Sequence, residues 1–63
     1  MDNLMKAEKL EEIEQKINDL KLEIEDIRTY FSIENNDHLH HEIYHINEQI
    51  TYLEEEYQRI LKL

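Results

Sequence analysis

Three histidines, His38, His41 and His45, recur at spacings that place them on one face of a helix. Imidazoles four residues apart converge, so His41 and His45 could chelate a divalent metal ion, and the nearby carboxylates of Glu42 and Glu48 could complete a zinc-like site. All these ligands would come from one exposed helix, without surrounding groups to orient them. We therefore favour a polar face, and we expect no metal and no cofactor. A pH-responsive face is an alternative, since imidazoles gain charge between about pH 7 and 5.

A second group of polar residues is the run of three glutamates at positions 54–56. Consecutive helical residues point in different directions, so these carboxylates do not converge on one atom. The chain contains no glycine, and it shows no phosphate-binding loop, nucleophile triad or dinucleotide fingerprint. We assign no catalytic residue, and the sequence argues against a conventional enzyme.

Two tyrosines, Tyr44 and Tyr52, fall outside the apolar pattern of the chain and share the outer half of one helix. Tyrosine is a favoured anchor of protein interfaces. The alternative is that these are scattered exposed aromatic residues, which need no functional explanation.

Two apolar repeats must form the elements that carry these residues. Each alternates steps of three and four residues, which is the spacing of a coiled-coil seam. The first repeat contains Leu10, Ile13, Ile17, Leu20, Ile24, Ile27 and Phe31, and the second contains Leu39, Ile43, Ile46, Ile50, Leu53, Tyr57 and Ile60.

The two repeats are out of phase, because the step of eight from Phe31 to Leu39 fits no continuous heptad pattern. We predict an all-α antiparallel hairpin in one domain, residues 1–63, with helices at about 3–32 and 38–63 and a turn at about 33–37. Asn36 or Asp37 can cap the second helix.

Sixty-three residues without cysteine rarely form a self-sufficient core. We expect two paired helices to leave each seam half covered. A homodimer that forms a four-helix bundle would cover the rest, and helices of another protein could replace the second hairpin.

The net charge is −9, and the excess of acidic groups extends over both halves of the chain. This charge argues against binding to nucleic acid or to anionic membranes. It suits a basic partner protein, or it merely keeps the chain soluble, which is the interpretation we favour. The chain contains no apolar stretch that could span a membrane and no signal-peptide core, so we expect a cytoplasmic protein.

Residues 46–59, INEQITYLEEEYQR, resemble the small sporulation-regulating aspartyl-phosphate phosphatases, which are helical hairpins of similar size with an S-Q-E-L-D signature in the second helix. The signature falls on Asn47, Glu48, Gln49, Ile50 and Thr51, and Tyr57 with Gln58 matches a following tyrosine and glutamine. The resemblance implies docking on a phosphorylated response regulator and hydrolysis of its aspartyl phosphate. Asn47 replaces the serine and Thr51 the aspartate, which puts the activity in doubt and implies a non-catalytic relative that still binds a regulator.

These observations favour an interaction protein with a regulatory or adaptor role, which acts through self-association and through a partner-binding face. We assign that face to Tyr44, Asn47, Glu48, Thr51 and Tyr52. Two alternatives stay open: a phosphatase-like regulator of a response regulator in a sporulation-type pathway, and an acidic decoy of a nucleic-acid-binding protein.

Overall fold

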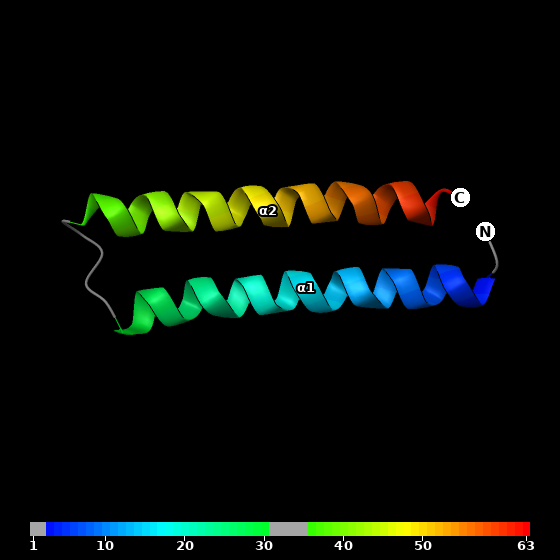
Figure 1. Ribbon diagram of the computed structural model, residues 1–63, viewed down its shortest axis with the longest axis horizontal. Helices are drawn as coiled ribbons and strands as arrows, with labels where there is room; N and C mark the ends of the chain where they lie inside the picture. Colours follow the sequence, from blue (N-terminus) through cyan, green and yellow to red (C-terminus); the bar gives the residue numbers. More distant parts are fainter. Residues whose placement is uncertain (1–2, 31–35) are drawn as a thin grey trace.

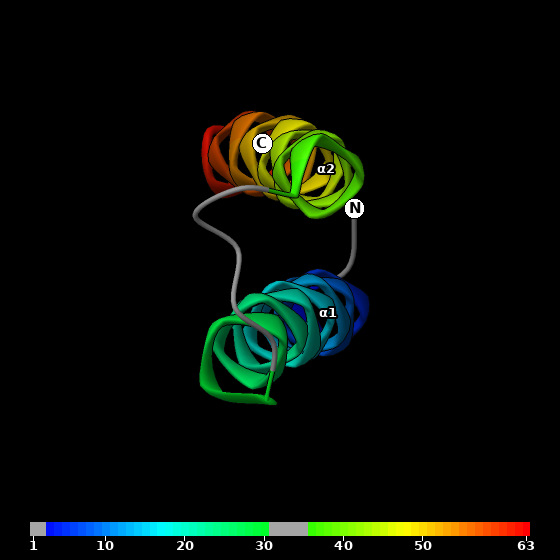
Figure 2. The same ribbon diagram turned by 90° about the vertical axis from the view of Figure 1, so that its left-hand side faces the viewer.

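The protein is an antiparallel hairpin of two long helices, as predicted (Figure 1). A computed structural model describes residues 3–30 and 36–63. Helix α1 spans Asn3–Tyr30 and helix α2 spans Asp37–Leu61, and the described residues contain no strand. The start of α1 and the end of α2 lie at the same end of the hairpin, and the Cα trace measures 48 × 16 × 10 Å. Viewed along the helices, the molecule is a single pair without a further layer (Figure 2).

The core is the predicted seam. Seven isoleucines are buried, and six further apolar residues pack against them. The buried residues are Ile13, Ile17, Ile27, Ile43, Ile46, Ile50 and Ile60, and the half-buried ones are Leu10, Leu20, Ile24, Leu39, Leu53 and Tyr57. Every seam residue of both repeats is therefore confirmed except Phe31, which lies outside the described residues.

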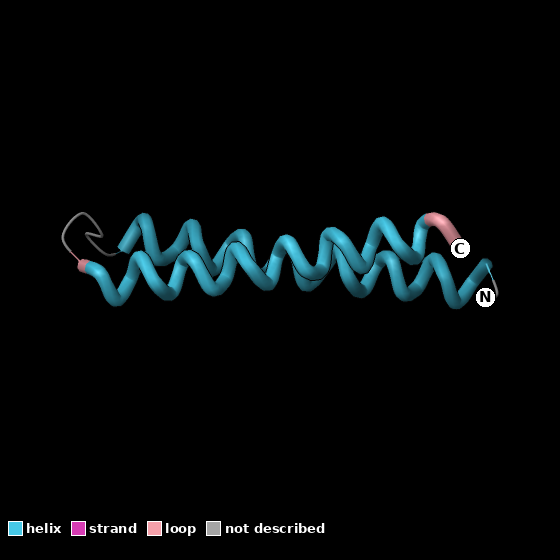
Figure 3. Tube along the Cα trace, turned by 90° about the horizontal axis from the view of Figure 1, so that it is seen from above, coloured by secondary structure: helices cyan, strands magenta, loops and turns pink. Residues whose placement is uncertain are grey.

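The seam is covered more completely than we expected from two helices. All seven isoleucines are less than one-tenth exposed, and Ile13 is only 2% exposed. The helices run alongside each other over nearly their whole length (Figure 1 and Figure 3), and the isoleucines of both belong to one buried cluster. Burial of each such side chain contributes about 1.5–3 kcal/mol. Only the half-buried residues of the seam keep exposed surface that a further helix could cover.

The start of α2 follows the predicted capping pattern. Asn36 has extended backbone angles, φ −119° and ψ 94°, and its side-chain oxygen accepts a hydrogen bond from the Leu39 N–H at 3.1 Å. Asp37 in the first turn places negative charge beside the positive end of the helix dipole. The helix begins one residue before the predicted position 38 and ends at Leu61, two residues before the predicted end. The predicted end of the first helix at residue 32 and the turn over residues 33–35 lie outside the described residues.

The open end of the hairpin is joined by a bond between the helices. Lys6 of α1 donates from Nζ to the backbone oxygen of Leu61 at 3.1 Å, over a sequence separation of 55 residues. A cation beside the last carbonyls of a helix satisfies an otherwise unpaired acceptor and opposes the negative end of the dipole. Neither described helix has both the length and the apolar character that a membrane span requires.

Candidate partner-binding face on α2

We define the outer face of α2 as Tyr44, Asn47, Glu48, Thr51 and Tyr52, the residues predicted to contact a partner. All five are exposed. The helical period explains this placement, because the isoleucines that alternate with them along α2 point into the seam. Tyr44, Glu48 and Tyr52 succeed one another at intervals of four residues, so they form a row along one side of the helix.

Glu48 is the centre of this row. A hydrogen bond with the Glu48 carboxylate raises the pKa of Tyr44, and the negative charge of Glu48 and slight desolvation raise it further. On the other side, Nδ1 of His45 lies 3.7 Å from Oε2 of Glu48. The rings of Tyr44 and His45 meet edge to face, with their centres 5.9 Å apart. Two aromatic side chains of the preceding turn therefore lie beside the Glu48 carboxylate.

Two shallow hollows lie on either side of Glu48, and both include this residue in their walls. Tyr44, Asn47, Glu48 and Thr51 line the first, of about 280 Å³. His45, Glu48, Gln49, Tyr52 and Leu53 line the second, of about 450 Å³. The structure thus brings four of the five predicted residues together and places Tyr52 in the neighbouring hollow.

His45 and Gln49 were not included in the predicted face. Both line the second hollow, where His45 is three residues before Glu48 and Gln49 is three residues before Tyr52. Residues three apart on a helix are neighbours on its surface. The spacing alone could therefore have predicted that His45 and Gln49 belong to the same face.

The polar groups of the outer face are either bonded within the helix or open to water. Thr51 donates its hydroxyl proton to the backbone oxygen of Asn47 at 3.1 Å, so this proton is already engaged within the helix. Glu48 and His45 are both exposed, and nothing in the hollows separates them from water.

We considered His38, His41 and His45 as weak candidates for a metal site. Within residues 3–30 and 36–63, no group of three or more His, Cys, Asp or Glu side chains could hold a metal ion. His38, His41 and His45 are all exposed, and His45 faces the Glu48 carboxylate.

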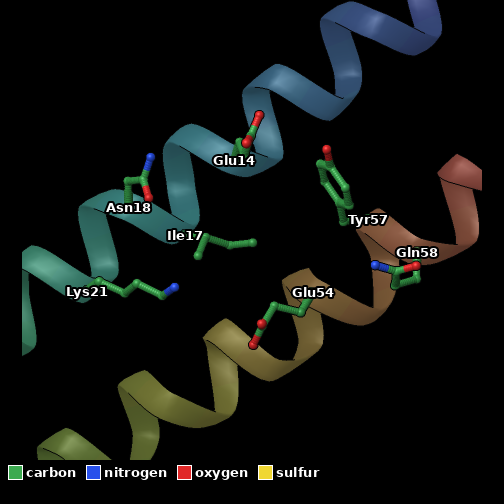
Figure 4. A pocket seen from close by; sticks show the side chains of 7 residues that line it. All are labelled: Glu14, Ile17, Asn18, Lys21, Glu54, Tyr57 and Gln58. Carbon is green, nitrogen blue, oxygen red and sulfur yellow. The ribbon is translucent and has the colours of Figure 1, made fainter.

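A third opening lies between the helices and has a different character (Figure 4). Its volume is about 290 Å³, and its walls are Glu14, Ile17, Asn18, Lys21, Glu54, Tyr57 and Gln58. Ile17 and Tyr57 belong to the core, whereas the other five side chains form a polar rim. Tyr57, one of the residues that carry the phosphatase resemblance, thus packs at the edge of the seam and has a structural role.

No protein-family model matches this chain, and comparisons with curated proteins and with solved structures likewise gave no match.

Proposed function

We propose that this protein acts by binding another protein through the outer face of α2, in a regulatory or adaptor role. The row formed by Tyr44, Glu48 and Tyr52 carries this proposal. Tyr44 is 60% exposed and Tyr52 is 62% exposed, although both are large amphipathic side chains. An exposed tyrosine on a rigid helix loses little conformational entropy when a partner covers it, which makes it an efficient anchor.

The charge of α2 supports a basic partner. The helix carries six carboxylates, at Asp37, Glu42, Glu48 and residues 54–56, but only one basic residue, Arg59, which lies in its last turn. From Asp37 to Gln58 no lysine or arginine neutralises these groups within the helix. Complementary charge accelerates association and selects among partners.

Self-association is part of the proposed function. The six half-buried seam residues are the surface that a second hairpin would cover in a four-helix bundle. The five residues of the outer face are not seam residues, although the hollow beside Tyr52 borders the seam at Leu53, so a homodimer would leave at least Tyr44, Asn47 and Thr51 free for a different protein.

Site-specific photocrosslinking tests the proposed face. A photoreactive residue replaces Asn47 or Thr51 on the outer face, or Glu25 on α1 as an exposed control. We expect the same host protein to be captured from both outer-face positions and not from position 25. The substitution Tyr52→Ala should reduce that capture, while helicity in circular dichroism stays unchanged. Equal capture from position 25, or none from either outer-face position, would contradict the proposal.

A response regulator is a second candidate for the partner. Four positions aligned with the S-Q-E-L-D signature, Asn47, Glu48, Gln49 and Thr51, are exposed, whereas Ile50 is buried in the core. The aligned polar positions are thus accessible to a docking protein.

The lifetime of a phosphorylated receiver domain from the host tests this candidate. Faster loss of phosphate in the presence of the hairpin, abolished by Asn47→Ala or Thr51→Ala, would support a phosphatase. Binding without a change in lifetime would support a non-catalytic regulator. Absence of binding would remove this candidate.

A further inference from the structure

We propose that the outer face of α2 recognises an arginine on a basic segment of the partner protein, with Glu48 as the acceptor and Tyr52 as the stacking surface. This inference rests on the proposed function and specifies the chemistry of the partner. It follows from the geometry of the row, from the free acceptor sites of Glu48 and from the charge of α2.

Glu48 and Tyr52 line one hollow and are four residues apart, which corresponds to about 6 Å along a helix. Tyr44 and Tyr52 are eight residues apart, which corresponds to about 12 Å along a helix, with Glu48 midway between them. The hollows on the two sides of Glu48 give access to its carboxylate and to the ring of Tyr52. A planar guanidinium can therefore reach the carboxylate while it lies against the tyrosine ring.

Glu48 retains acceptor sites for this contact. A carboxylate offers about four lone-pair positions. Tyr44 uses one through its hydrogen bond, and His45 at 3.7 Å is beyond hydrogen-bond distance. Among the described residues, no lysine or arginine forms an ion pair with Glu48.

The same geometry favours arginine over lysine. A guanidinium donates two parallel hydrogen bonds to one carboxylate and stacks on an aromatic face at the same time. An ammonium group is a compact, strongly hydrated charge that cannot do both in this way. The site thus distinguishes two side chains of equal charge, and this separates it from general attraction to an acidic helix.

Titration of the full-length, ¹⁵N-labelled protein with synthetic peptides tests the inference. The peptides are alanine- and glutamine-based helices that differ at one position, which is arginine, lysine or citrulline. We expect the arginine peptide to shift the amide signals of residues 44–52 and to bind about fivefold more tightly than the lysine peptide, from stacking and bidentate contact. The neutral citrulline peptide should cause no saturable shift.

Variants identify the groups responsible. Glu48→Gln and Tyr52→Ala should remove the preference for arginine, whereas Tyr52→Phe should keep it because the ring remains. Glu42→Gln is the matched control, since it removes the same charge from the same helix and should keep the preference. Circular dichroism establishes that each variant is folded.

Three results would overturn the inference. They are equal binding of arginine and lysine peptides, an equal effect of Glu42→Gln and Glu48→Gln, and no shift in residues 44–52 at millimolar arginine peptide. The proposed function would survive each of them if one partner is still crosslinked from positions 47 and 51. Loss of that crosslink alone would instead remove the proposed function.

Discussion

The pKa of Tyr44 makes the stability of the protein depend on pH. Its hydrogen bond to Glu48 raises its pKa above the ordinary value of 10.0. Because the pKa in the folded state is the higher one, the contact stabilises the protein below the unfolded pKa and is lost as pH rises through the folded pKa.

We expect Glu48→Gln to lower the pKa of Tyr44 toward 10.0, since the substitution removes the charge and the strong acceptor. The measurement is an NMR titration of the tyrosine ring carbons between pH 8 and 12. Glu42→Gln should leave this pKa unchanged. A Tyr44 pKa that is the same in the unmodified protein and in Glu48→Gln would contradict the expectation.

Ile13 is the most deeply buried side chain of the core, at 2% exposed. Ile13→Val removes one methylene group from a packed seam and should lower the free energy of unfolding by about 0.5–1.5 kcal/mol. Leu22→Ala removes more atoms, but from a side chain that is 57% exposed, and should change the free energy by less than about 0.5 kcal/mol. Urea denaturation at one protein concentration measures both. A larger effect at Leu22 than at Ile13 would place the core elsewhere.

At the scale of the helices, the Asn36 side chain stabilises the start of α2 by accepting the Leu39 N–H. Asn36→Ala leaves this donor without its partner and should cost about 1 kcal/mol of stability. Asn47→Ala is the matched control in the middle of the same helix, where alanine is the better helix former, so it should be neutral or slightly stabilising. Thermal denaturation compares the two variants. Equal effects of both would show that the cap contributes nothing.

The helices were predictable from the sequence because their information is periodic. The steps of three and four residues identified the seam, and the phase break before Leu39 required a chain reversal. Asn36 was recognisable as a cap from its residue type and its place before the second repeat. The bond from Lys6 to Leu61 was not predictable, because it depends on how far one helix slides along the other.

The candidate face was predictable only in part, for the same reason. Helical spacing placed Tyr44, Glu48 and Tyr52 on one side of α2. It did not reveal that Glu48 joins two hollows or that His45 turns toward it, since these features depend on side-chain rotamers.

At the scale of the whole molecule, the net charge of −9 on 63 residues opposes folding through self-repulsion. The Glu12–Lys16 ion pair, at 3.7 Å, is more than half exposed, so salt removes little stabilisation when it screens this pair. Raising the salt concentration from 10 to 500 mM shortens the screening length from about 30 Å to less than 10 Å, so it should raise the midpoint of thermal unfolding. Calorimetry at pH 7 measures this. A midpoint that falls with added salt would mean that attractive pairs outweigh the repulsion.

The thinness of the molecule leads to the last prediction. A hairpin whose Cα trace is 10 Å thick in its shortest dimension has one layer of core, and six of its seam residues are only partly buried. A second hairpin would bury them, so we expect a homodimer of twice 7.8 kDa in sedimentation equilibrium. The midpoint of thermal unfolding should then rise with protein concentration, because association stabilises the folded state by mass action. Tyr52→Ala lies outside the seam and should leave the mass unchanged. A fully helical species of 7.8 kDa at high concentration would show instead that the isoleucine seam suffices within one hairpin.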